Sequence, residues 1–148
     1  MHIRISNKIG FSARIFGVAW VLNLFWEFAE RPLYVAGTLS PFSWGWIRAA
    51  TWDAGYVIIV YLVLAILHGD FYWLRRKNVW DLGLIILVGF ATATVVEQQA
   101  LASGKWFYTS LMPIVPILKI GLAPFIQLPF LAFLTYWFAR SRFSEYFE

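Results

Sequence analysis

The chain has 148 residues, of which 61% are hydrophobic and 14% are charged, and its mean hydropathy is +0.67. A soluble domain of this size needs a polar shell that so few charged residues can hardly supply, so the composition indicates an integral membrane protein. The net charge of +4 does not point to nucleic acid, because the basic residues lie at the ends of apolar segments. The absence of cysteine excludes disulfides, thiolate metal sites and cysteine nucleophiles.

Four apolar segments are long enough to cross a membrane, which takes about 20 residues in a helix. The first contains Asn23 and Glu27 and is followed by no small-residue cleavage site, so we interpret it as a span rather than a signal peptide. The predicted fold is an all-α, polytopic four-helix bundle in a single membrane domain covering residues 1–148. Its spans are expected at about residues 11–28, 47–67, 80–102 and 120–139.

The connection between the third and fourth segments, residues 105–122, is too apolar for a solvated loop. Pro113 and Pro116 block a regular long helix there. We therefore expect this outer loop to lie in the membrane interface or to fold back over the bundle. In the last segment, Pro124 and Pro129 predict a helix that begins at Pro124 or is kinked.

The distribution of basic residues predicts the orientation of the bundle. Four spans place both termini on one side, with eight of the 12 Lys and Arg residues: Arg4, Lys8, Arg14, Arg75, Arg76, Lys77, Arg140 and Arg142. The opposite side has the remaining four, which are Arg31, Arg48, Lys105 and Lys119. This excess predicts cytoplasmic termini in a bacterial inner membrane. Tryptophans support it, since Trp73, Trp80 and Trp137 would mark the inner interface and Trp44, Trp46 and Trp106 the outer one.

Four carboxylates in or beside the apolar segments are expected near the outer bilayer face: Glu27, Glu30, Asp53 and Glu97. Charged side chains in hydrocarbon cost about 2.5–3.5 kcal/mol on insertion scales, so residues of this kind usually face a bundle interior and mark a site.

Other polar and aromatic residues fall at the same predicted depth. Asn23, Glu27 and Glu30 follow an i, i+4, i+7 pattern and form one helix stripe. Asp53 shares a face with Tyr56, and Gln127 lies early in the last span. Together with Trp26, Trp106 and Tyr108, these polar residues predict a pocket to which every helix contributes.

Clustered carboxyl groups in a low dielectric suit acid–base chemistry, because some remain protonated while others are ionised. Aromatic faces beside them can stabilise a carbocation. We therefore interpret the pocket as a site that binds, cyclises or isomerises an isoprenoid-like lipid. Glu97 and Glu27 would be the acid and its partner and Asp53 an electrostatic stabiliser. The ligand would contact Asn23, Trp26, Tyr56, Trp106, Tyr108 and Gln127.

A structural interpretation of the same residues stays open. Glu30 could form an exposed interfacial pair with Arg31, and Asp53 could pair with Arg48. The cluster could consist of buried salt bridges or shared protons that hold four helices together, with counter-charges from Arg31, Arg48 or Lys105.

No cofactor or metal is predicted, and the alternative that stays open is a hard cation on the carboxylates, since an oxygen-rich site suits Mg²⁺, Mn²⁺ or Ca²⁺ rather than zinc. His2 lies at the start of the chain and His68 on the side away from the carboxylates, where His68 and Asp70 fit a solvated turn. Either Asn78 or Asp81 most simply starts the third helix.

Two stretches resemble the small bacterial and archaeal lycopene cyclases. The segment Glu97-Gln-Gln-Ala-Leu-Ala-Ser-Gly-Lys-Trp106-Phe-Tyr108 is similar to their pattern E-x-x-A-x-x-x-G-x-W-x-Y, and Asn23-Leu-Phe-Trp26-Glu27-Phe is similar to their Trp-Glu elements. The resemblance implies a polytopic protein that works without metal and protonates a polyene end. It implies Glu97 and Glu27 as acids, with Trp106 and Tyr108 lining the site.

The prolines show a second resemblance. The segments Met112-Pro113-Ile-Val-Pro116 and Gly121-Leu-Ala-Pro124-Phe-Ile-Gln127 are similar to those of a family of small bacterial four-span proteins.

Two other classes of function fit the same pattern. A membrane glutamate beside tryptophan on the first of four helices, here Trp26-Glu27, looks like the small multidrug exporters, which are proton-coupled transporters. An aromatic content of 20%, with Phe130, Phe133 and Trp137 on the last span, also suits a non-catalytic subunit of a larger complex or a homo-oligomer.

Overall fold

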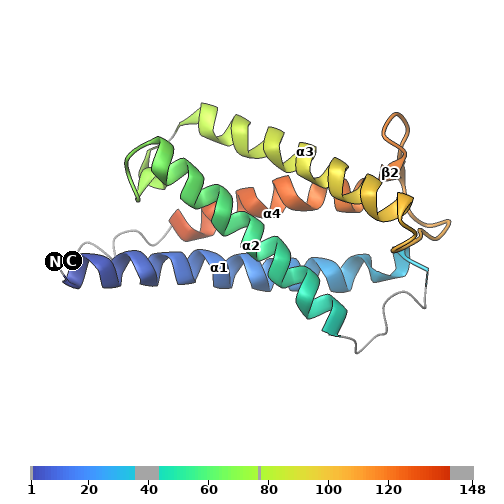
Figure 1. Ribbon diagram of the computed structural model, residues 1–148, viewed down its shortest axis with the longest axis horizontal. Helices are drawn as coiled ribbons and strands as arrows, with labels where there is room; N and C mark the ends of the chain where they lie inside the picture. The colour runs from blue at the N-terminus through green and yellow to red at the C-terminus, as the bar shows by residue number, and fades with distance from the viewer. Residues whose placement is uncertain (1, 36–43, 77, 141–148) are drawn as a thin grey trace.

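The structure, a computed structural model, describes the backbone of residues 2–35, 44–76 and 78–140 and the side chains of these ranges from Asn7 onward. It contains four long helices (Figure 1), which are α1 (His2–Glu30), α2 (Trp44–Leu67), α3 (Val79–Ala102) and α4 (Leu122–Arg140). Each is long and apolar enough to cross a membrane, over Asn7–Leu33, Trp44–Leu67, Val79–Ala102 and Leu122–Arg140. The predicted all-α four-helix bundle is confirmed.

α1 and α4 form the centre of the bundle. α4 packs against both α1 and α3, while α2 packs mainly against α1. The start of α1, the connection between α2 and α3, and the end of α4 lie together at the left of Figure 1. We call this the basic end, because Arg75, Arg76 and Arg140 lie there. Residues 36–43 and the basic residues Lys77 and Arg142 lie outside the described residues.

Two helices bury a stripe with a spacing of mostly four residues. On α1 the stripe is apolar toward the basic end and polar toward the other, in the order Phe11, Ile15, Ala19, Asn23, Glu27 and Glu30. On α3 it runs through Asp81, Ile85, Gly89, Ala93, Glu97 and Ala100. Residues four apart lie on one face of a helix, so the polar members of each stripe face the neighbouring helices. The position of each polar group along the helix axis is set by its place in the chain.

The contact between α3 and α4 is closest at Gly89. A Cβ atom added to Gly89 would lie 2.8 Å from Cα of Pro129, which is nearer than two carbon atoms can pack. Pro129 lies inside α4 and Pro124 in its first turn, where the backbone N–H has no partner to lose. The helix begins at Leu122, two residues before the predicted start at Pro124.

Replacing Gly89 with alanine is expected to lower the free energy of unfolding. Overpacking costs about 1–3 kcal/mol, and only about 1 kcal/mol is regained from the better helix propensity of alanine. Gly83 on the same helix is the matched control, because a Cβ there meets nothing within 4 Å. Unfolding of both variants in mixed detergent micelles measures the difference. Equal stability of Gly89→Ala and Gly83→Ala would contradict the close contact.

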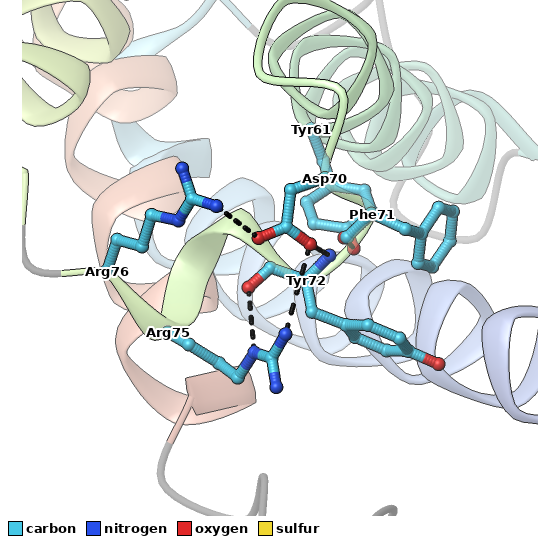
Figure 2. A network of polar contacts seen from close by, with 6 residues as sticks. All are labelled: Tyr61, Asp70, Phe71, Tyr72, Arg75 and Arg76. Carbon is cyan, nitrogen blue, oxygen red and sulfur yellow. Dashed lines mark hydrogen bonds and ion pairs between the residues drawn. The ribbon is translucent and has the colours of Figure 1, made fainter.

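At the basic end the α2–α3 connection folds into a polar network around Asp70 (Figure 2). The Asp70 carboxylate accepts a hydrogen bond from the backbone N–H of Tyr72 at 2.9 Å and forms ion pairs with Arg76 at 3.2 Å and Arg75 at 4.0 Å. Tyr61 donates a hydrogen bond to the carbonyl of Phe71. This network ties the connection and the short helix η2 (Trp73–Arg75) to the end of α2.

Three sequence predictions at this end can be compared with the structure. Asn78 caps α3, since its side chain accepts a hydrogen bond from the N–H of Trp80 at 3.1 Å. His68 and Asp70 lie in and beside a turn and are both partly exposed, as predicted, and His68 has an additional contact, with its Nε2 2.9 Å from Asp81 Oδ1. Trp73 was expected at the interface but is 2% exposed, because its indole N–H donates to the carbonyl of Tyr61 at 3.1 Å.

The opposite end of the bundle is closed by a cap, which we define as residues 31–35 and 105–121. It contains the short helix η1 (Arg31–Leu33) and a hairpin of β1 (Ile114–Val115) and β2 (Ile120–Gly121). The N–H of Val35 donates to the carbonyl of Phe107, and that of Thr109 donates to the carbonyl of Leu33, both at 2.9 Å. The loop between α3 and α4 therefore folds back on the bundle, which is one of the two arrangements expected from the sequence. The hairpin of β1 and β2 within this loop was not predicted.

Candidate functional site

Four carboxyl side chains from three helices lie together beneath the cap. Glu27 and Glu30 come from α1, Asp53 from α2 and Glu97 from α3, and all are close enough to interact electrostatically. The three glutamates are between 5% and 8% exposed, and Asp53 is half-buried. The residues expected at one depth are therefore also brought together in the interior, and we call them the carboxyl cluster.

Gln127 of α4 is the central hydrogen-bond donor of the site. Its Nε2 lies 3.2 Å from Asn23 Oδ1, 3.1 Å from Glu27 Oε1 and 3.0 Å from Asp53 Oδ2. An amide nitrogen has only two hydrogens, so the three acceptors compete for them. Gln127 thereby links α4 to both α1 and α2.

Glu27 and Asp53 both accept from the amide nitrogen of Gln127, so their carboxyl groups lie next to each other. Two neighbouring carboxyl groups can hydrogen-bond to each other only when one of them carries a proton, so such a pair suits a shared proton. Asn23 is oriented by its own helix, since its Nδ2 donates to the carbonyl of Ala19 at 2.9 Å.

Glu97 is held from the cap by two aromatic donors. Trp106 donates its indole N–H to Glu97 Oε2 at 3.2 Å, and the hydroxyl of Tyr108 donates to the same oxygen. That hydroxyl in turn accepts the backbone N–H of Gly121 at 2.9 Å. Burial raises the pKa of Tyr108, and its bond to Glu97 raises it further, so Tyr108 stays a donor at neutral pH.

Tyr34 closes the cap over this group. Its ring packs on Trp106 and Tyr108, with centroid distances of 6.3 Å and 5.6 Å. Burial raises the pKa of Tyr34, and the nearby carboxylates Glu30 and Glu97 raise it further, so it too remains neutral. Tyr34 is not among the site residues predicted from the sequence. The only signal there is an aromatic residue shortly after the first apolar segment.

Glu30 belongs to the cluster, contrary to the sequence analysis, which left it out of the candidate site. It is 6% exposed and accepts the indole N–H of Trp26 at 3.0 Å. Arg31 does not pair with it but lies 6.0 Å from the ring of Trp46, so the exposed Glu30–Arg31 pair is wrong. The helix stripe of Asn23, Glu27 and Glu30 in the sequence already points to this position, although no role in the candidate site follows from it for Glu30.

No basic side chain in the described ranges forms an ion pair with the carboxyl cluster. The ion pairs there join His68 to Asp81 and Asp70 to two arginines, all at the basic end. Lys105, proposed as a counter-charge, lies 5.4 Å from the ring of Trp106. Hydrogen bonds from neutral side chains, rather than salt bridges, therefore hold the described part of the cluster; the donors are Trp26, Trp106, Tyr108 and Gln127.

Tyr56 is the one predicted site residue that lies apart from this group. Its side chain packs against the hydrophobic core, and its buried hydroxyl faces Thr92 without a well-aligned hydrogen bond. It shares a helix face with Asp53, as predicted, but three residues of helix carry it about 4.5 Å toward the basic end. Tyr56 is therefore better described as a packing residue.

An apolar groove of about 390 Å³ opens on the side of the bundle beside the cluster. We call it the side groove. Its lining is hydrocarbon and aromatic rings from three helices, namely Trp26 of α1, Ile86 and Phe90 of α3, and Ile126, Pro129, Phe130 and Phe133 of α4. Trp26 contributes its ring to this groove and its N–H to Glu30, so the groove meets the cluster at this residue.

In the part of the chain that the structure describes, no three His, Asp or Glu side chains are placed to hold a metal ion. Comparison with protein-family models, curated proteins and solved structures found no match to the chain.

Proposed function

We propose that this chain is a lipid-binding protein of the bacterial cytoplasmic membrane, with both termini cytoplasmic, that transfers protons to and from an isoprenoid-like lipid. The observation that carries the proposal is the carboxyl cluster. It gathers four acids from three helices with no basic partner among the described residues, beside a groove that admits only hydrocarbon.

The side groove supports a lipid rather than a polar solute. All seven lining residues present carbon atoms, apart from the indole N–H of Trp26, which is already bonded to Glu30. A polar solute in such a groove would lose its hydrogen bonds to water without gaining others, which is costly. A hydrocarbon chain loses none, and it can enter from the bilayer through the open side.

The cluster supports proton transfer. Both donors to Glu97 contact its Oε2, which leaves Oε1 without a hydrogen bond among the described residues and free to present a proton. A proton from Glu97 to an alkene would form a C–H bond and leave a carbocation, which neighbouring aromatic rings stabilise. A carboxylate of the Glu27–Asp53 pair would then take a proton from the adjacent carbon. The lipid gains one proton and loses one, and the cycle closes when the proton gained by the Glu27–Asp53 pair is released and Glu97 is protonated again from solvent.

Deuterium transfer from solvent into the lipid tests this proposal. The protein would be reconstituted into vesicles in D₂O with an acyclic carotenoid polyene, and the recovered polyene would be analysed by mass spectrometry. Glu97→Gln is expected to lower deuterium incorporation about 100-fold, the usual contribution of a general acid, while the amount of bound polyene stays the same. Glu27→Gln and Glu30→Gln extend the test to the partner acid and to the acid beside the side groove.

Asp81→Asn is the matched control, because Asp81 is a carboxylate on the same helix as Glu97 with 8% exposure but lies at the basic end. It is expected to leave deuterium incorporation unchanged. Wild-type incorporation in the double variant Glu27→Gln, Glu97→Gln would overturn the proposal, and so would equal losses in Glu97→Gln and Asp81→Asn.

A proton-coupled transporter is the second candidate, and one observation favours it. Gln127 ties α4 to carboxyl groups on both α1 and α2, so a change in their protonation would alter contacts among three helices. The same vesicles test it when a pH gradient is applied with an organic cation inside. Transport is favoured if efflux of the cation collapses the pH gradient in the wild type but not in Glu27→Gln, and if the protein binds no polyene.

A further inference from the structure

A second cavity lies at the basic end, on the far side of the bundle from the carboxyl cluster. It has a volume of about 230 Å³ and opens between η2, the start of α3 and the end of α4. Its walls are largely apolar, with Ile85, Phe133 and Trp137 among the lining residues, while Arg76 and Arg140 also contribute to it. The combination of an apolar wall and two cations distinguishes it from the side groove, which has no charged lining.

The charges around this cavity leave Arg140 available for a ligand. Asp70 engages Arg76 at 3.2 Å, as Figure 2 shows. Asp81, the acid in the lining, is engaged by His68 at 2.9 Å. Arg140, in the last turn of α4, lines the same cavity as Asp81 but forms no ion pair with any described residue. A cation at the edge of an apolar cavity, with no ion-pair partner in the described part of the chain, suits an anion that carries a hydrocarbon tail.

We propose that this cavity binds an anionic phospholipid, with the headgroup phosphate on Arg140 and Arg76 and one acyl chain along Phe133 and Trp137. Phosphate accepts paired hydrogen bonds from a guanidinium, which favours arginine at such a position. Basic pockets between membrane helices are a known mode of headgroup recognition. The indole of Trp137, 61% exposed, places an amphipathic ring where a headgroup meets its chain.

Thermal unfolding in detergent with added lipid tests the site. Phosphatidylglycerol is expected to raise the Tm of the wild type by several degrees more than phosphatidylcholine does, because a ligand that binds only the folded state stabilises it. Arg140→Gln should remove at least half of this difference, whereas Arg140→Lys should retain part of it. Without lipid, Arg140→Gln should unfold at the wild-type temperature, since Arg140 has no ion-pair partner among the described residues to lose.

Arg75→Gln is the matched control. Arg75 lies at the same end and also faces Asp70, at 4.0 Å, but does not line the cavity. It should keep the full response to phosphatidylglycerol. Equal losses in Arg75→Gln and Arg140→Gln would show a diffuse charge effect and overturn the proposal. Stabilisation by inorganic phosphate alone equal to that by phosphatidylglycerol would overturn the assignment to a lipid.

Discussion

Replacing Gln127 with leucine is expected to lower the free energy of unfolding by about 3 kcal/mol or more. Leucine has a similar volume, so the change removes the amide and leaves the packing of α4 largely intact. Two hydrogen bonds, shared among the side-chain oxygens of Asn23, Glu27 and Asp53, are then lost. A buried group left without its hydrogen bond costs about 1–3 kcal/mol, and more if it is charged.

Unfolding by a denaturing detergent in mixed micelles measures this loss. Gln98→Leu is the matched control, because Gln98 is an exposed amide near the same end whose single contact is a 3.4 Å hydrogen bond to the carbonyl of Leu118. It should change the stability by no more than about 0.5 kcal/mol. Equal stability of the two variants would mean that Gln127 does not organise the carboxyl cluster.

Filling the side groove is expected to abolish lipid binding while leaving the carboxyl cluster intact. Ile86→Trp and Ile126→Trp, combined, add two indole rings from opposite walls, on α3 and α4. A hydrocarbon chain then has no space, so the polyene retained after purification should fall at least tenfold. Ile126 adjoins Gln127, but the substitution leaves every hydrogen-bonding group of the cluster in place.

The control for this variant carries two tryptophans on lipid-facing positions outside the groove. Leu87 on α3 and Ile59 on α2 are 66% and 60% exposed, so Leu87→Trp and Ile59→Trp together should retain the wild-type amount of polyene. Together with Glu97→Gln, the groove variant separates two steps, since Glu97→Gln should bind polyene without exchanging deuterium. Normal polyene retention by the groove variant would assign the lipid to another surface.

The sequence predicted that the polar residues of the candidate site lie at matching heights along their helices, because position along a helix axis follows from residue number at about 1.5 Å per residue. Glu27, Asp53, Glu97 and Gln127 come from four different helices, and they meet because their heights match. The start of α3 was also predicted to within three residues, since capping depends on a few adjacent residues, and the structure selects Asn78 over Asp81 as the N-cap.

The direction in which each side chain faces was harder to predict from the sequence than its height along the helix. In a membrane the outer face of a helix is as apolar as its packed face, so hydrophobic periodicity does not distinguish the two. Glu30 was therefore left out although it continues the buried stripe, and Tyr56 was included although it packs toward the basic end. Trp73 shows the same limit, because only the fold brings the carbonyl of Tyr61 to its indole N–H.

The sequence by itself therefore determined the number of spans, the level of the acids and the excess of positive charge on one side, since each depends on length, composition or local order. The tertiary structure alone decided that the cap closes over Glu97, that Gln127 reaches acceptors on two other helices, and that a groove opens beside Trp26. These features arise from contacts between residues up to 104 positions apart, and such contacts depend on how whole helices pack.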